Sequence, residues 1–506
     1  MTGLVRYRML IDGAWVDAGD GGTFESMTPA TGEPWAVVPE ATAADVDRAV
    51  EAAHRAFTEG PWSRTTPTER GRSLRRLADL LADRSEQLGR TETVDTGKML
   101  KETRWQAKYI ADFFHFFAGC ADKVHGATLP IDKPDLCVFT AREPLGVVAA
   151  VVPWNSQLFL VAVKLGPALA AGNTVVLKAS EHASAAMLEF GRLIEEAGIP
   201  SGVVNIVTGH GDPCGRVLTS HPLVARVSFT GGPESARHVV RNSAENFAQV
   251  SLELGGKSPF VVFEDADLES AVNGSIAGIF GASGQSCVAG SRLYLQERIA
   301  DRFLDDMVSR ARSIVIGDPL EEATQMGPLA TTAQLERIEK EVAGAVEEGG
   351  TVLHGGRRPA RPNRGWYYEP TIVDCPRQSM RIRRHRAVRP GAERAALPRR
   401  GGGRRAGQRH PTRPGRRHLH PRQRPLAAGR PRRARRHRLG EHLPRGVAHR
   451  RVRRLQGLRL RARERFPGHL RLHPAEDHLD EPVQRADGEP VRDAVARGRP
   501  LLDAQR

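Results

Sequence analysis

A sharp change in composition near residue 380 divides the chain and limits which part of it can fold. Residues 381–506 contain 37 Arg, no Lys and 11 acidic residues, a net charge of +26. Residues 1–380 hold the other 38 basic and 48 acidic residues, a net charge of −10. The Arg-, Pro- and Gly-rich second part lacks the patterned apolar content that a core needs. We therefore expect a folded segment up to about residue 382 and, over 383–506, a tail without a fold.

In residues 1–380, amphipathic stretches with helical spacing alternate with short apolar runs of strand length. Helical stretches near 183–197, 233–245 and 267–280 separate the runs, as in the βαβ crossovers of a parallel sheet. This pattern predicts an α/β fold with a Rossmann-like doubly wound sheet. The predicted buried strands are Val147–Val152, Thr174–Leu177, Val203–Val207, Ala225–Phe229 and Pro259–Phe263.

Two helices near the start of the chain are predicted from their first turns. Thr42 and Asp45 have the spacing of a capping box. Thr66-Pro67 starts the second helix, with proline at the first helical position. The apolar stripes are Val46, Val50, Ala53 and Phe57 in the first helix and Leu74, Leu77, Leu81 and Leu88 in the second.

The sequence has no targeting, membrane-spanning or disulfide pattern. Its first residues lack the apolar core of a secretory signal, and no uncharged apolar run reaches the roughly 18 residues of a membrane span. The five cysteines are scattered and form no C-x-x-C pair, so we expect reduced thiols and no metal site. A cytoplasmic protein is the default expectation.

Cys287 has the surroundings of a catalytic nucleophile. A reduced cysteine is in general more often a buried structural thiol. In the segment 284–292, however, small residues and glycines allow the backbone to present the sulfur and its own N–H to a ligand. A thiolate that attacks a carbonyl needs such an N–H, because negative charge collects on the carbonyl oxygen.

Two further side chains suit this chemistry. Glu253 ends an apolar run before two glycines, where a carboxylate among apolar neighbours can activate water, although a solvated strand-end glutamate is the plainer interpretation. Asn155 follows the predicted strand Val147–Val152 at its carboxyl end, where α/β enzymes bind ligands. Its amide can complete an oxyanion site, although an ordinary turn residue is the alternative.

Two other strand ends suit a dinucleotide. In the segment 229–233, two glycines and a helix start follow an apolar run, and a helix N-terminus there suits a pyrophosphate. Lys178 and Glu181 end another strand with a cation and an anion, which without context would be a surface ion pair. The segment 209–211 is too incomplete to count as the usual G-x-G-x-x-G motif.

Together these segments resemble the aldehyde dehydrogenase superfamily. Its cysteine motif, its E-L-G-G-K motif at Glu253 and its P-W-N motif at Asn155 occur in the expected order and spacing, over about three quarters of the chain. The resemblance implies that Cys287 forms a thiohemiacetal, that Asn155 and the Cys287 N–H hold the oxyanion, and that Glu253 activates the deacylating water. Hydride passes to the cofactor between the two covalent steps.

The resemblance also implies NAD as the cofactor. Lys178 would hold the adenosine ribose hydroxyls, and Glu181 beside the 2′-hydroxyl would repel the 2′-phosphate of NADP, the less favoured cofactor. Gly232 departs from the family's commoner F-T-G-S sequence. The implied cofactor-binding residues are Val152, Trp154, Lys178, Glu181, Gly209, Thr230, Gly231, Gly232 and Leu254.

The same resemblance implies a domain layout. Residues 1–125 and 144–253 would form the NAD-binding domain, and 254–382 a truncated catalytic domain. The polar, β-prone stretch 126–143 would be a projecting hairpin, through which the intact family forms homodimers or homotetramers. The expected partner is a small aldehyde, with no nucleic acid and no membrane. The predicted aldehyde tunnel is lined by mostly apolar or small residues, Gln157, Leu158, Phe159, Ser286 and Val288.

A shifted reading frame explains the tail better than a nucleic-acid-binding arm, because such arms rarely exclude both Lys and Ser. Reading codons for Ala387–Arg394 one nucleotide later can give P-F-G-P-V-L-S-V, and three later segments also become family-like, in the right order. The slip is expected between Met380 and His385. Arg386 then stands where the family has a Glu that contacts the nicotinamide ribose, and no role transfers to it.

Two alternative functions stay open. A CoA-acylating relative would discharge the acyl-enzyme with CoA, although Glu253 in its E-L-G-G-K context favours water. An inactive pseudo-enzyme or NAD-binding scaffold would result if the loss of the C-terminal catalytic and oligomerisation segments abolishes activity.

Overall fold

A seven-stranded sheet organises the first two thirds of the computed structural model, which describes residues 3–384 and 391–397. Its strands are β2 (Met9–Ile11), β3 (Ala14–Val16), β8 (Val147–Val151), β9 (Thr174–Lys178), β10 (Val204–Val207), β11 (Val224–Gly231) and β12 (Gln249–Leu254). They follow the order β12-β11-β8-β9-β10-β2-β3; the first five run parallel, and β2 is antiparallel to β10. This order confirms the predicted doubly wound α/β fold.

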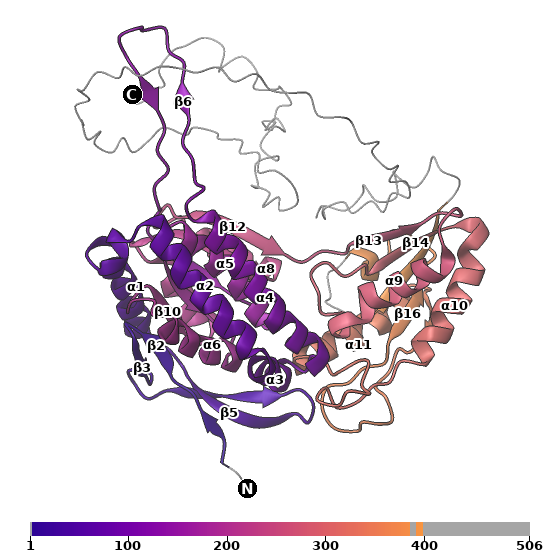
Figure 1. The fold of residues 1–506 in the computed structure, drawn as a ribbon. Coiled ribbons are helices and arrows are strands. Elements are labelled where there is room, and N and C mark those ends of the chain that lie inside the picture. The colour runs from indigo at the N-terminus through magenta and orange to yellow at the C-terminus, as the bar shows by residue number, and fades with distance from the viewer. Residues whose placement is uncertain (1–2, 385–390, 398–506) are drawn as a thin grey trace, which may run out of the picture. The chain divides into compact units, whose positions relative to one another are not determined.

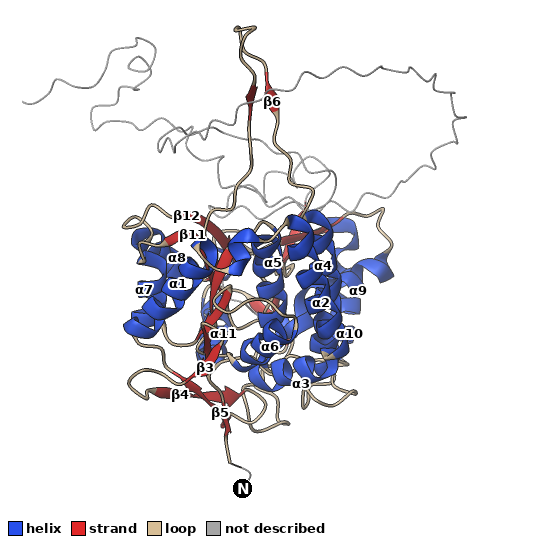
Figure 2. Cartoon of the chain, turned by 60° about the vertical axis from the view of Figure 1, so that its left-hand side comes forward, coloured by secondary structure: helices blue, strands red, loops and turns tan. Residues whose placement is uncertain are grey.

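Helices cover both faces of this sheet. They are α1 (Ala43–Thr58), α2 (Pro67–Asp83), α4 (Leu100–Cys120), α5 (Gln157–Ala170), α6 (Ala185–Glu196), α7 (Arg216–Ser220) and α8 (Pro233–Asn242). Val148 and Ala150 of β8 join the core under α2, α4, α5 and α6, whereas Val147 and Ala149 join the core under α1, α7 and α8. Figure 2 shows the sheet edge-on between these two groups. Because both faces are covered, the central strand β8 is apolar throughout, as the sequence indicated.

Helices α1 and α2 begin where the sequence predicts. Thr42 and Asp45 exchange hydrogen bonds between side chain and backbone, and Thr66 and Glu69 do the same, so both capping boxes are formed. The second helix is shorter than its apolar stripe suggested. It ends at Asp83, and Leu88 lies buried in the next helix, α3 (Ser85–Thr96).

The stretch 126–143 contains the predicted hairpin. Strands β6 (Thr128–Leu129) and β7 (Val138–Phe139) pair antiparallel, and Figures 1 and 2 both show them projecting away from the helices. The hairpin exposes apolar side chains: Leu129, Leu136 and Phe139 are 41%, 54% and 71% exposed. Its role in oligomerisation stays a prediction.

A second sheet has five strands in the order β13-β14-β17-β16-β15. Its strands and the main helices beside them are β13 (Pro259–Val262), β14 (Arg292–Gln296), β15 (Thr351–His354), β16 (Thr371–Asp374), β17 (Gly391–Leu397), α9 (Leu268–Phe280), α10 (Ala300–Arg312) and α11 (Thr332–Glu347). The apolar pattern placed the strand at 259–263 in one series with the cofactor strands, whereas the domain layout implied by the resemblance assigned it to residues 254–382. It pairs with β14 in this second sheet, so the chain changes sheets between Leu254 and Pro259.

The structure corrects one expectation for the tail. Gly391–Leu397 forms β17, where the sequence predicted no folded element. This strand lies between β14 and β16 and runs parallel to both. Ladder hydrogen bonds come from the backbone, so two open strand edges can accept a segment with weak strand propensity. Arg386 and residues 398–506 lie outside the described residues.

Short elements complete the described chain. They are β1 (Val5–Arg6), β4 (Thr23–Thr28), β5 (Glu33–Pro39), η1 (Pro61–Arg64), η2 (Gly211–Gly215), η3 (Gly281–Gly284), η4 (Glu297–Ile299) and α12 (Arg381–Arg384). Strands β1, β5 and β4 make a three-stranded sheet. None of the helices over residues 3–384 is both long and apolar enough to span a membrane.

Candidate functional site

The carboxyl ends of the parallel strands bring distant segments of the sequence to one sheet edge. Strand β8 pairs with β9 on one side and β11 on the other, so the chain winds away from β8 in both directions. Ligands of open α/β sheets bind at such a switch point, outside the carboxyl ends of the strands. Asn155 follows β8, Lys178 ends β9 and Thr230 lies at the end of β11.

A tight turn precedes Cys287 and leaves it exposed. Within η3, Ala282 and Ser283 have left-handed backbone, with φ of 50° and 52°. This conformation is costly for a residue with a Cβ, so contacts must hold it. The Ala282 N–H donates to the Glu102 carboxylate at 3.0 Å, and the Ser283 hydroxyl donates to a backbone carbonyl at 2.8 Å. The nucleophile candidate thus follows an anchored turn.

The side chain of Asn155 reaches this loop. Its Nδ2 donates a hydrogen bond to the carbonyl oxygen of Gln285 at 2.7 Å, across 130 residues of sequence. Gln285 is itself buried, and its side-chain oxygen accepts the N–H of Ala330 at 2.9 Å. The structure therefore brings the predicted amide donor to the loop that carries Cys287.

Glu253 is more open than expected. It lies in β12, paired with Thr230 of β11, and its side chain is exposed together with Leu252 and Leu254. The expectation of apolar neighbours enclosing Glu253 is wrong for the described residues. β12 is an edge strand, and an edge strand has a neighbouring strand on one side only. Water has direct access to this carboxylate.

Lys164 of α5 is a candidate that the sequence analysis missed. Its side chain is 7% exposed, and its Nζ donates to the Ser228 hydroxyl at 3.0 Å. Burial lowers the pKa of Lys164 to about 8, while the charge of Glu253 acts in the opposite direction. A buried lysine that interacts with a carboxylate is typical of functional sites. Its only sign in the sequence is a lone cation in the apolar run 157–170.

Lys178 and Glu181 form a half-enclosed ion pair after β9. The Lys178 Nζ lies 3.7 Å from the Glu181 carboxylate and donates to the carbonyl of Ala179 at 3.0 Å. Lys178 is 4% exposed. Burial acts to raise the pKa of Glu181, but the Lys178 ammonium, a backbone N–H and two nearby histidines hold it below its ordinary value. Glu181 is therefore a carboxylate at neutral pH.

The end of β11 has unsatisfied polar groups. Thr230 is 8% exposed, and its hydroxyl has no hydrogen-bond partner among the described residues. Gly232 is the N-cap of α8 and supplies no side-chain cap, and a Cβ added there would meet nothing within 4 Å. A groove of about 400 Å³ beside this helix start is lined by Pro233, Ala236, Arg237, Val240, Arg241, Leu252 and Leu254.

Three other predicted cofactor residues lie directly after strands β8 and β10. Val152 is buried, and its N–H donates to the carbonyl of Lys178 at 3.0 Å. Gly209 follows β10 with φ of 144°, and a Cβ added there would lie 3.1 Å from the Cβ of Cys214. Only glycine fits this position without strain. Trp154 is half-buried in the turn after β8.

The predicted aldehyde tunnel is wrong at two positions. Gln157 and Leu158 have no exposed surface and face the core, because they stand on the inner side of the first turn of α5. Phe159 is half-buried and packs near the rings of Tyr109 and Phe113, with centroids 6.4 and 6.2 Å away. Val288 is 69% exposed.

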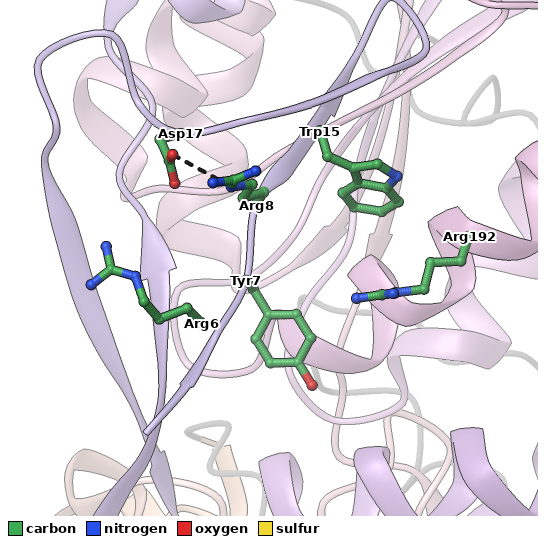
Figure 3. Close-up of a pocket in the computed structure, with 6 residues that line it drawn as sticks. All are labelled: Arg6, Tyr7, Arg8, Trp15, Asp17 and Arg192. Carbon is green, nitrogen blue, oxygen red and sulfur yellow. Dashed lines mark ion pairs between the residues drawn. The ribbon is translucent and has the colours of Figure 1, made fainter. Parts of the chain in front are cut away.

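A second hollow lies apart from all these residues. It has a volume of about 370 Å³ and is lined by Arg6, Tyr7, Arg8, Trp15, Asp17 and Arg192, which Figure 3 shows. Arg8 pairs with Asp17 at 3.4 Å and Arg192 with Glu189 at 3.2 Å, so much of its positive charge is neutralised. Within the described part of the chain, no cluster of three or more His, Cys, Asp or Glu could hold a metal ion.

Comparisons with known proteins agree on one family. Its model, the aldehyde dehydrogenase family, matches residues 15–387. (Z)-2-((N-methylformamido)methylene)-5-hydroxybutyrolactone dehydrogenase of Acinetobacter baylyi is 54% identical over 370 residues, 73% of this chain and 75% of that protein. Hydroxyisobutyraldehyde dehydrogenase of Mycolicibacterium austroafricanum is 43% identical over 383 residues, 76% of this chain and 75% of that protein.

Solved structures agree with this result. The NAD+ complex of an aldehyde dehydrogenase from Bacillus cereus superposes with a TM-score of 0.78 at 36% identity, covering 80% of this chain and 82% of the other. The family match includes Asn155, Glu253 and Cys287 and ends close to the change in composition. The chain therefore belongs to the aldehyde dehydrogenase family, and it is an oxidoreductase that acts on aldehydes.

Proposed function

We propose that this chain oxidises an aldehyde to a carboxylic acid with NAD+ and water, through a covalent intermediate on Cys287. The hydrogen bond from Asn155 to the Gln285 carbonyl carries the proposal, because it holds an amide donor at the loop of an exposed cysteine. The relatives named above are dehydrogenases. They give no support to the alternative of an inactive pseudo-enzyme or NAD-binding scaffold.

The chemistry follows from three side chains. The Cys287 thiolate attacks the carbonyl carbon, a C–S bond forms, and negative charge moves to the oxygen, to which the Asn155 amide and the Cys287 N–H donate. NAD+, when bound, supplies the acceptor for the hydride that leaves this carbon, and a thioester remains on Cys287. Glu253 takes a proton from water, the water oxygen attacks the thioester carbon, and the acid and the thiolate separate.

The residues at the strand ends fit NAD+. The unsatisfied Thr230 hydroxyl and the uncapped start of α8 suit a pyrophosphate, because both offer hydrogen-bond donors to an anion. Lys178 and Glu181 would hold the adenosine ribose. The groove along α8 combines apolar and cationic side chains, which suits a flat, polar base. Discharge of the thioester by water rather than CoA is supported by the exposed carboxylate of Glu253.

Replacing the nucleophile tests this proposal. With propanal and NAD+, Cys287→Ala should lose the burst of NADH and lower kcat by on the order of 10³-fold or more, because no covalent intermediate can form. Cys137→Ala is the matched control, since Cys137 is also exposed but lies in the hairpin, and it should keep the burst. If Cys287→Ala keeps the burst and kcat, the proposed mechanism is wrong.

A further inference from the structure

Three charged side chains are buried together where α3 ends. Glu92 and Asp95 have no exposed surface, and Lys98 is 2% exposed. Gly97 ends α3 in the left-handed conformation. The chain turns there, and the side chain of the next residue, Lys98, is buried. Burying a charge is costly unless it is paired or hydrogen-bonded, so the partners of these groups indicate what the cluster does.

The partners of Lys98 lie beside the proposed oxyanion donor. Its Nζ donates to the Ser156 hydroxyl at 2.9 Å and to the Gln106 side-chain oxygen at 2.5 Å. Ser156 directly follows Asn155 and is the N-cap of α5, yet its hydroxyl caps no backbone N–H of its own helix. The hydroxyl that would ordinarily fix the helix start is used by a lysine 58 residues away in the sequence.

The two buried acids lie beside the next residues of the same turn, and Asp95 binds one of them. Asp95 accepts the side-chain N–H of Gln157 at 3.4 Å, the Ser26 hydroxyl at 2.6 Å and the N–H of Ala185 at 2.9 Å. Glu92 lies near the first backbone N–H groups of α5, but neither of its carboxylate oxygens accepts a hydrogen bond among the described residues. Burial raises the pKa of Glu92, while Lys98 and these N–H groups act to lower it. The buried cluster therefore holds α5 at its first turn, beginning at Ser156.

Hydrogen bonds fix Asn155 on two sides. Its side chain ends at the Gln285 carbonyl, and the residue after it is fixed by Lys98. Resting on the proposed function, we propose that Lys98 is a positioning residue for the reaction: through Ser156 it sets the turn that aims the Asn155 amide at the reacting oxygen. Catalysis is sensitive to such aim, since a misplacement of about 1 Å can cost on the order of 100-fold in rate.

Two substitutions and one control test the proposal. Ser156→Ala and Lys98→Met should each lower kcat for propanal by roughly 10-fold or more, with a much smaller change in the KM for NAD+, because Lys178 and Thr230 lie on other strands, β9 and β11. Lys108→Met is the control: Lys108 is an exposed lysine on the neighbouring helix α4, and its loss should leave kcat unchanged. If the Lys98→Met chain does not fold, the kcat of the Ser156→Ala chain tests the positioning role by itself.

A double-mutant cycle with Asn155→Ala separates positioning from general stability. If Ser156 and Lys98 act through Asn155, their substitutions should have almost no further effect on kcat once Asn155 is alanine. An equal loss of kcat in both backgrounds would overturn the positioning role, as would unchanged kcat in the Ser156→Ala chain. If Asn155→Ala alone leaves kcat unchanged, the proposed oxyanion site is wrong. This result differs from a failure of the positioning role, in which Asn155→Ala lowers kcat but Ser156→Ala does not.

Discussion

The carboxylate of Glu181 defines the cofactor preference that the site would show. It is charged at neutral pH and held 3.7 Å from Lys178, so a ligand with an additional phosphate on the ribose would meet a fixed negative charge. Glu181→Ser removes this charge and should raise kcat/KM with NADP relative to NAD by on the order of 10-fold.

The measurement is the ratio of kcat/KM for the two cofactors with one aldehyde. Glu189→Ser serves as the matched control, because Glu189 also pairs with a cation, Arg192, but belongs to α6 and not to the segment that follows β9. Its substitution should leave the ratio as it was. An unchanged ratio in Glu181→Ser would show that Glu181 does not contact the ribose.

Single residues were predictable where local sequence determines the chemistry. Asn155 and Cys287 each belong to a short motif, and the hydrogen bond from Asn155 to Gln285 brings those two motifs together. Lys98 and Lys164 were missed because their meaning depends on partners far along the chain, Ser156 and Ser228. Burial also escaped prediction: nothing within the motif of Glu253 indicates that β12 is an edge strand.

At the scale of elements, the hairpin of β6 and β7 exposes apolar side chains. Phe139 is 71% exposed and Leu136 is 54% exposed. Exposed apolar side chains that lie together are typical of contact surfaces between proteins. We propose that this hairpin is an oligomerisation arm. Phe139→Asp should therefore shift the chain toward the monomer, because a charge at an apolar contact must be desolvated when two copies associate.

Light scattering at several concentrations measures this shift. Phe247→Asp is a suitable control, since Phe247 is 93% exposed but lies between α8 and β12. It should leave the molar mass unchanged. If Phe139→Asp has the same molar mass as the unsubstituted chain at every concentration, the hairpin is not the contact between copies.

Elements followed from the sequence where periodicity and caps agreed. The capping boxes predicted the starts of α1 and α2, and short, mainly apolar runs predicted β8 to β11 within one or two residues. The division of one apolar stripe into α2 and α3 at Arg84 was not predictable, because Leu88 of α3 continues the helical spacing of the buried leucines of α2. β17 was missed because its place depends on two strand edges in other parts of the chain.

For the whole molecule, similarity and composition change at nearly the same place. The family match ends at residue 387, and the Arg-rich composition begins at about 381. The reported relatives are covered to 75% of their lengths. We infer a shifted reading frame from both observations, because codons can be chosen for the residues after Met380 that encode family-like segments, in the right order, when they are read one nucleotide later.

Restoring the frame tests this explanation on the complete protein. A gene corrected by one nucleotide within codons 378–386 should encode a chain that oxidises propanal with NAD+ at least about 10-fold faster than the present one. The reason is that the corrected chain should regain the later catalytic segments of the family and the glutamate that the resemblance implies at the place of Arg386. Cys287→Ala in the corrected chain must again abolish the activity, which shows that both chains use one site. A genomic sequence with an uninterrupted frame, and equal kcat for the two chains, would establish that the Arg-rich tail is native.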